Sequence, residues 1–368
     1  MTDGSSAAAD ERLADASLLI GLLEYDQADE LLRAVLRDAR AVGGDQLASR
    51  ALEALGTIAT RRGREAEARR LMEQALELAG DADPVEREML YWELARVCSG
   101  LGDPDRSVEI LERAVSLFDD DADLKARITL QVALSYAHTD NGHYGRAGDA
   151  LADLIQRGAQ DLDARSRARI NYASGRLNLV LGRGDQAIDH AARAVEDYRE
   201  AGFEYGLADA LLFYAHALLD GGQTEAAGVA LREARALYGP KPSAVDVGFL
   251  HTDEARYHLQ RGENELAIES VREAIDHLGD LSMVAELGDA YLVLARAYDE
   301  LGELDSADRA YGTAIDLLRR QRGWYRELSK AYRWYGKFLR RTGRTEAAME
   351  MLERAGDISL RLQEMLER

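Results

Sequence analysis

Residues 292–317 read LVLARAYDELGELDSADRAYGTAIDL, and this stretch decides the fold. The pattern predicts a helix, a turn at Gly302 and a second helix that carries Ala307 and Ala314. Residues 52–79, LEALGTIATRRGREAEARRLMEQALELA, follow the same template with the turn at Gly63. The sequence therefore contains copies of one helical hairpin, and the turn glycine provides a position on which the whole chain can be aligned.

The turn glycine recurs at an almost constant interval along the chain. Successive copies are 39, 40, 40, 40, 40, 40 and 41 residues apart, and a fainter first copy has Leu23 in the same place. A period of this length indicates a solenoid, in which each hairpin buries its apolar face by stacking on its neighbours. The aligned glycines are Gly63, Gly102, Gly142, Gly182, Gly222, Gly262, Gly302 and Gly343.

Three further columns keep the same register in all nine copies. Five residues after the turn, eight copies have Ala and one has Ser, and seven residues further on seven copies have Ala. Small residues at these places allow two helices to approach closely where they cross. The third column lies seven residues before the turn and holds Ala16, Gly56, Ala95, Ser135, Gly175, Ala215, Ala255, Ala295 and Gly336.

Together these columns resemble the tetratricopeptide repeat over residues 9–368, and the long copies resemble the sensor domains of bacterial helix-turn-helix transcriptional regulators. The resemblance implies an all-α fold, a right-handed α-solenoid superhelix of about nine helical hairpins. The period departs from the usual 34 residues, and the proline that usually closes a repeat is missing. We therefore expect longer helices or longer links between hairpins.

We expect the domain organisation to follow from the repeats. Residues 1–8 are expected to form a short disordered tail, and residues 9–368 to form a single superhelical domain. The expected repeats are 9–48, 49–87, 88–127, 128–167, 168–207, 208–247, 248–287, 288–328 and 329–368.

The composition limits the cellular locations and the classes of binding partner that we expect. The chain has 46 Lys and Arg against 67 Asp and Glu, and this net charge of −21 disfavours wrapping of nucleic acid by the whole molecule. No apolar run approaches the roughly 20 residues that cross a bilayer, and the acidic N-terminus does not resemble a secretory signal. A single cysteine, Cys98, excludes an internal disulfide. We expect a cytoplasmic protein without a membrane segment.

Motifs that would indicate an enzyme are missing from the sequence. There is no G-x-x-x-x-G-K-[ST] phosphate loop, no strand followed by G-x-G-x-x-G and no H-E-x-x-H. The seven histidines are scattered over different repeats, and Cys98 is expected to be a small core residue. We therefore expect no catalytic residues, no cofactor and no metal site.

The residues most informative about binding are those expected to line the concave groove. By the resemblance, the residue after the small one points into the groove, and in that column five of nine residues are basic and none is acidic. Residues four positions earlier lie on the same helix face. The predicted groove residues from the two columns are Trp92, Arg96, Tyr136, Tyr172, Arg176, His216, Arg256, Arg296, Arg333 and Lys337.

This basic and aromatic set supports two interpretations. In the first, the groove binds a protein or peptide segment of acidic character, because arginine forks bind carboxylates and rings add apolar contact. Arg96 is expected to pair with Trp92, and Arg176 with Tyr172. In the second, these arginines reflect ordinary helix composition and pair weakly with nearby carboxylates.

A second unusual feature is residues 319–344, which hold ten basic residues and one acid, Glu327. We expect Lys330, Arg333 and Lys337, with the two arginines at 340 and 341, to form one exposed stripe. The stripe could contact a protein, a second copy of the chain or phosphates, or it could be a solvated terminal helix. The basic patch comprises Arg319, Arg320, Arg322, Arg326, Lys330, Arg340, Arg341 and Arg344, beside the groove residues Arg333 and Lys337.

The C-terminal hairpin ends the repeat array with apolar residues, among them Ile358, Leu360 and Met365. An uncovered last hairpin would favour a homodimer through this repeat. The function that we predict is a non-enzymatic scaffold that binds a partner segment in its groove, in bacterial signalling or regulation. Two alternatives are the ligand-sensing part of a transcriptional regulator, acting with a DNA-binding domain or partner, and a nucleic-acid-associated protein that uses the basic C-terminal repeat.

Overall fold

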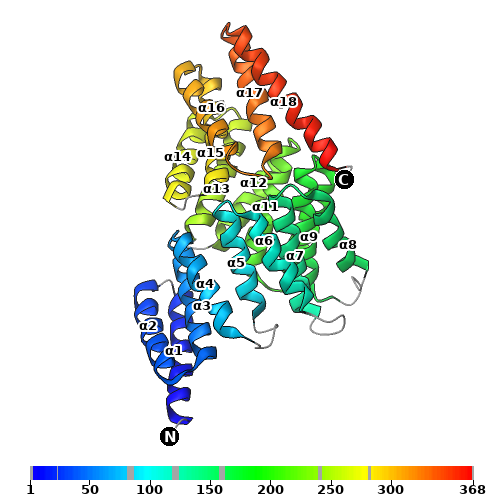
Figure 1. Ribbon diagram of the computed structural model, residues 1–368. Coiled ribbons are helices and arrows are strands. Elements are labelled where there is room, and N and C mark those ends of the chain that lie inside the picture. The colour runs from blue at the N-terminus through cyan, green and yellow to red at the C-terminus, as the bar shows by residue number, and fades with distance from the viewer. Residues whose placement is uncertain are drawn as a thin grey trace. The chain divides into compact units, whose positions relative to one another are not determined.

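The computed structural model describes residues 3–22, 24–80, 87–117, 124–156, 162–238, 243–280 and 283–366. The regular elements of these residues are eighteen helices, which follow one another as nine hairpins (Figure 1). The all-α prediction is therefore confirmed. The helices are α1 (Asp3–Gly21), α2 (Tyr25–Val42), α3 (Asp45–Arg61), α4 (Glu65–Ala79), α5 (Glu88–Gly100), α6 (Pro104–Ser116), α7 (Leu124–Asp140), α8 (Tyr144–Gln156), α9 (Ala164–Val180), α10 (Gly184–Glu200), α11 (Glu204–Asp220), α12 (Thr224–Tyr238), α13 (Ala244–Gln260), α14 (Asn264–Asp280), α15 (Val284–Leu301), α16 (Leu304–Leu318), α17 (Tyr325–Arg341) and α18 (Thr345–Leu366).

The turn glycines have the conformation that their recurrence predicts. All eight have a positive φ, between 67° and 84°. At the sixth hairpin the N–H of Gln223, just after Gly222, donates to the carbonyl of Leu218 at 2.8 Å. This bond closes the end of the helix, and glycine adopts the left-handed backbone in that motif without a Cβ clash. Leu23, which takes the glycine's place in the first copy, lies outside the described residues.

The columns of small residues lie where the two helices of a hairpin cross. Ala215 and Ala227 are both fully buried in the sixth hairpin. In the fourth, the hydroxyl of Ser135 donates to the carbonyl of Ala147 at 3.1 Å, so the column before the turn touches the column after it. A Cβ added to Gly56 of α3 would lie 2.7 Å from the side chain of Met72 on α4. Larger side chains would therefore push the helices apart.

The structure corrects two of the expected boundaries. Helix α1 begins at Asp3, so residues 3–8 are helical and do not form a disordered tail; the run Ala7 to Ala9 has high helix propensity. Several first helices also begin before the expected repeat starts, since α13 begins at Ala244 where we expected residue 248. The additional residues of the long period thus extend the helices, and only residues 201–203 separate α10 from α11.

Contacts divide the chain into two compact units, residues 1–133 and 134–368, and the boundary falls inside α7. Unit 1 has a core that includes Leu32, Val35 and Leu55. Unit 2 has a larger core, in which Tyr311 and Phe338 of the last two hairpins are almost fully buried. No helix in the described part of the chain combines the length and the apolar character that a membrane span requires.

Within unit 2 the ninth hairpin rests on the fourth. The hydroxyl of Tyr144 donates to the carbonyl of Gly323 at 3.3 Å, and Arg322 donates to the side chain of Asn141 at 3.4 Å. Helix α18 also contacts α8. Gly323 approaches Asp140 so closely that an added Cβ would lie 2.8 Å from the Asp140 Cα. We call these interactions the closure contact.

Candidate ligand-binding site

The first helices of the last four hairpins line one cavity in unit 2. Helices α11, α13, α15 and α17 each contribute side chains to a space of about 160 Å³. The repeat register explains this convergence, because equivalent faces of successive first helices turn to the same side of the array. The lining residues are Leu219, Asp220, Arg256, Gln260, Asp289, Leu292, Val293, Arg296, Lys330 and Trp334.

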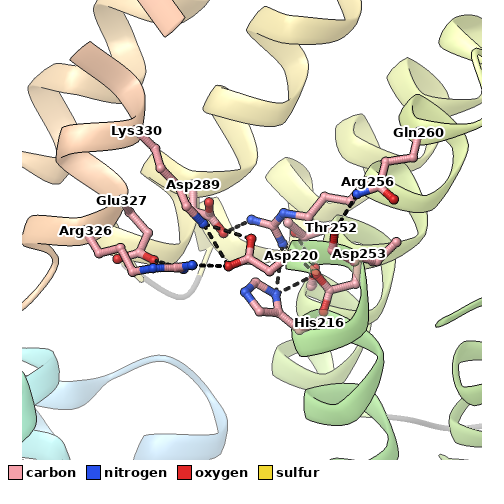
Figure 2. A network of polar contacts seen from close by, with 12 residues as sticks. His216, Asp220, Thr252, Asp253, Arg256, Gln260, Asp289, Arg326, Glu327 and Lys330 are labelled. Carbon is pink, nitrogen blue, oxygen red and sulfur yellow. Dashed lines mark hydrogen bonds and ion pairs between the residues drawn. The ribbon is translucent and has the colours of Figure 1, made fainter. Parts of the chain in front are cut away.

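Arg256 is the centre of a polar network along this cavity (Figure 2). Its guanidinium donates to Asp253 at 2.5 Å and also bonds to Asp289 on α15. The ring of His216 on α11 lies 2.9 Å from the same Asp253 oxygen. Burial alone would raise the pKa of Asp253, but His216 and Arg256 lower it below its ordinary value. Asp253 therefore stays charged, and together with Asp289 it holds Arg256 in place.

Asp220, at the end of α11, binds two cations from α17. Lys330 donates to its carboxylate at 2.9 Å, and Arg326 bonds to the same group. Figure 2 shows these side chains reaching toward Asp220 from the ninth hairpin. Burial raises the pKa of Asp220, but Lys330, His216 and Arg326 together bring it well below its ordinary value. This ion cluster ties the ninth hairpin to the sixth across the inner surface.

Arg296 and Trp334 separate this cavity from a second one of about 220 Å³. The guanidinium of Arg296 lies 4.2 Å from the centroid of the Trp334 ring. Burial lowers the pKa of Arg296, and Tyr311 and Glu300 partly offset this effect. The second cavity is also lined by Lys337, which is exposed.

The predicted groove residues of the fourth and fifth hairpins form a separate aromatic group. Arg176 lies 4.8 Å from the centroid of Tyr136 and 3.9 Å from Asp140. Tyr136 and Tyr172 meet edge to face at 6.5 Å. Arg176 thus stacks on the ring from the preceding repeat, whereas we expected Tyr172 of its own repeat. Burial raises the pKa of Glu286, the nearby acid on α15, to about 7.

The remaining predicted residues are not among those that line the cavity. In unit 1, Arg96 donates to Glu93 at 2.7 Å, an i, i+3 pair in place of the expected pairing with Trp92. Trp92 is half-buried on the same helix, α5. Arg333 in unit 2 is exposed. Around the cavity of unit 2 the structure brings together His216, Arg256 and Arg296 from the predicted set, with Lys337 at the rim of the second cavity.

The basic patch is largely neutralised by carboxylates of the same chain. Arg326 and Lys330 pair with Asp220, so the expected exposed stripe is wrong for Lys330, which is half-buried. Long side chains of α17 reach acids on other repeats, a contact that residue spacing alone does not reveal. The other ion pairs are Arg341 with Asp299, Arg344 with Asp308 at 2.8 Å, and Arg319 with Asp316 at 3.9 Å. Arg320 and Arg340 are exposed, and Arg322 belongs to the closure contact.

Sequence reasoning missed the acids and the tryptophan of this site. Asp253 and Trp334 lie two residues before the small residue of their repeats, and Asp220 lies five residues after it. The basic column lies one residue after the small residue, so a position four residues further on, such as Asp220 after His216, lies on the same helix face.

The described residues include no group of three or more His, Cys, Asp and Glu side chains that could hold a metal ion. Cys98 is fully buried in unit 1, and this burial raises its pKa to about 11. A thiol with such a pKa is protonated at neutral pH and is a poor nucleophile.

Comparison with known proteins supports the repeat assignment. Models of the tetratricopeptide repeat match residues 51–86, 90–121 and 288–317, which include segments of both units. These three segments are therefore tetratricopeptide repeats. A search of curated protein sequences finds no match.

Several solved structures have a similar fold. A Rap protein complexed with Competence and Sporulation Factor is 16% identical, with a TM-score of 0.62 over 86% of this chain and 98% of that one. The quorum sensor NprR of B. thuringiensis is 15% identical, with a TM-score of 0.59 over 84% and 87%. Aspartyl phosphate phosphatase F of Bacillus subtilis is 14% identical, with a TM-score of 0.60 over 85% and 94%. At these identities the likeness concerns the fold.

Proposed function

We propose that this tetratricopeptide repeat protein is a non-enzymatic scaffold that binds a peptide or an extended protein segment on the inner surface of unit 2. The convergence of α11, α13, α15 and α17 on one polar cavity is the observation that carries the proposal. Four equivalent helix faces offer successive contacts to an extended ligand, and charged side chains held by ion pairs are already oriented before binding.

The test is selection of ligands from a soluble pool of synthetic random octapeptides by the full chain, followed by hydrogen exchange on the complex. We expect selected peptides to slow exchange in the second halves of α11, α13 and α15 and in α17. Slowed exchange only in the outer helices α12, α14 and α16 would contradict an inner binding surface. Retention of no peptide would contradict the proposal itself.

A second candidate is the ligand-sensing part of a regulatory protein. The similar structures include a complex with Competence and Sporulation Factor and a quorum sensor. In this chain the closure contact between the ninth and fourth hairpins provides an element that a ligand could shift, because Asp220 binds α17 through the cavity wall. A separate DNA-binding domain or partner would read the changed pitch. Superimposable free and bound structures would exclude this mechanism.

Nucleic-acid binding by the C-terminal repeat gains no support from the charge arrangement. Arg326, Lys330, Arg341 and Arg344 all pair with carboxylates of unit 2. Phosphate binding would require these pairs to break, and each pair that breaks reduces the gain from the new contact.

A further inference from the structure

Arg296 differs from the other cations of the inner cavity because it forms no ion pair with any of the described residues. Arg256 and Lys330 each bond to carboxylates. Within the described part of the chain, Arg296 makes no hydrogen bond or ion pair. Its guanidinium carbon lies 4.2 Å from the centroid of the Trp334 ring, a cation–π contact. Burial lowers the pKa of Arg296, and Tyr311 and Glu300, neither of them hydrogen-bonded to it, offset this effect only in part. A half-buried guanidinium without a counter-ion is unfavourable, and a bound anion would relieve this cost.

The charges around Arg296 indicate the valence of that anion. The smaller cavity is lined by two carboxylates and three cations, and the larger one also by two carboxylates and three cations. Arg296 belongs to both sets, so the combined lining holds five cations and four carboxylates, and the buried Asp253 beside it also pairs with Arg256. The charges are thus nearly balanced, and Asp289 and Glu300 would repel a dianion such as phosphate more strongly than a monoanion.

The Trp334 ring also determines how an anion could approach. An aromatic ring stacked on a guanidinium covers one face and leaves the N–H groups at its edge free to donate. Those donors form a planar fork that matches a carboxylate in two parallel hydrogen bonds. Because Arg296 lines both cavities, a group bound at its edge lies in the space that four first helices share.

We propose that Arg296, stacked on Trp334, binds one carboxylate of the ligand, either a chain terminus or an Asp or Glu side chain. This inference rests on the proposed function and names the chemistry of one subsite. Exposed Lys337, at the rim of the second cavity, adds a longer-range attraction for the same charge.

The test uses octapeptides retained by the wild-type full chain, each resynthesised with a free C-terminus and as the C-terminal amide. For each peptide with an internal Glu, a second version has Gln in its place, and both versions carry a C-terminal amide. This pair distinguishes a side-chain carboxylate from a terminal one. Affinities are measured for the wild type, Arg296→Gln and Arg296→Lys. The control is Arg309→Gln, an exposed arginine on the outer helix α16. Thermal unfolding of each variant confirms that it is folded.

We expect one carboxylate of each ligand to strengthen binding roughly ten- to hundredfold over its amide, as for other charge-assisted hydrogen bonds. Arg296→Gln should abolish this difference, Arg296→Lys should restore part of it, and Arg309→Gln should leave it unchanged. The proposed carboxylate subsite is wrong if folded Arg296→Gln still binds the carboxylate form of each peptide more tightly than the amide form. It is also wrong if the wild type binds the two forms equally. In both cases the proposed scaffold function stands. Tighter binding of a phosphoserine peptide would also contradict it. If no peptide is retained, both proposals fail.

Discussion

At the scale of single residues, the charged side chains on the inner surface of unit 2 differ in whether they form an ion pair. Arg256 has a side chain only 17% exposed, and Asp253 and Asp289 on either side of it are 6% and 16% exposed. A buried ion pair adds little net stability relative to an apolar replacement, but loss of one member leaves the other charge without compensation. The network therefore positions its members more than it stabilises the fold.

Replacement of Arg256 by Ala should lower the free energy of unfolding by about 3–5 kcal/mol, because Asp253 and Asp289 would lose their cationic partner in a poorly solvated place. Chemical denaturation followed by circular dichroism measures the change. Arg235→Ala is the control, since that side chain is 51% exposed and its pair with Glu254 should contribute less than about 1 kcal/mol. Equal losses for the two variants would show that burial does not decide the effect.

Glu286 provides a residue-scale prediction that depends on pH. Its pKa in the folded protein is raised from the ordinary 4.5 to about 7 by burial, with Asp140 adding to the shift and Arg176 opposing it. Between these values the folded state holds a proton that the unfolded state has released. The contribution of Glu286 to stability is therefore complete below pH 4.5 and is lost as the pH rises through 7.

Glu286→Gln should remove this pH dependence. We expect the variant to be more stable than the wild type by about 1–3 kcal/mol at pH 8 and nearly equal to it at pH 4.5. Thermal unfolding at both pH values measures the difference, which corresponds to an increase in Tm of roughly 2–4 °C per kcal/mol at pH 8. A difference that is the same at both pH values would exclude a raised pKa as its cause.

At the scale of the element, each hairpin depends on close helix crossing at its small residues. In α12 the neighbours Ala226 and Ala227 differ only in the face they present: Ala226 is exposed and Ala227 is fully buried. Ala227→Leu must therefore displace α11, whereas Ala226→Leu places the same side chain in solvent. We expect the first to destabilise the protein by about 1–3 kcal/mol or more and the second by less than about 0.5 kcal/mol. Urea denaturation of both variants compares them directly, and a neutral Ala227→Leu would show that the crossing tolerates expansion.

The whole molecule consists of two units, and within unit 2 the closure contact links hairpins that are far apart in the sequence. Tyr144 and Gly323 are 179 positions apart, and Lys330 and Asp220 are 110 positions apart. Such contacts form only after the intervening hairpins have stacked in order. Unit 2 should consequently unfold its last hairpin more readily when the closure contact is lost.

Gly323→Ala tests the closure contact. Gly323 has a φ of 77°, and an added Cβ would lie 2.7 Å from the backbone carbon of Asp140. We expect this variant to exchange amide hydrogens faster in α17 and α18, while Gly312→Ala in α16, which has open space for a Cβ, should be neutral or stabilising by about 0.5–1 kcal/mol. Unchanged exchange in the last two helices of Gly323→Ala would mean that the contact does not hold the ninth hairpin.

The sequence by itself determined the hairpins, their number and their register. Each hairpin depends on its turn glycine, the small residue before it and the alanines after it. These residues interact within one hairpin, over at most about twenty residues, so they recur in the sequence with the period of the repeat. The basic groove column was also visible, and the structure places His216, Arg256 and Arg296 of that column on one inner surface.

Only the tertiary structure decided which of these cations are compensated. Asp253 contacts His216, which is 37 positions away in the sequence, and Asp289 contacts Arg256, which is 33 positions away. Asp220 contacts Lys330 of α17, which is 110 positions away. Whether these side chains meet depends on the pitch at which the hairpins stack. That pitch is the sum of many small crossing angles, and it produces no periodic pattern in the sequence. The same summation brings the ninth hairpin onto the fourth and leaves Arg296 beside the Trp334 ring, without an ion pair to any carboxylate of the described residues.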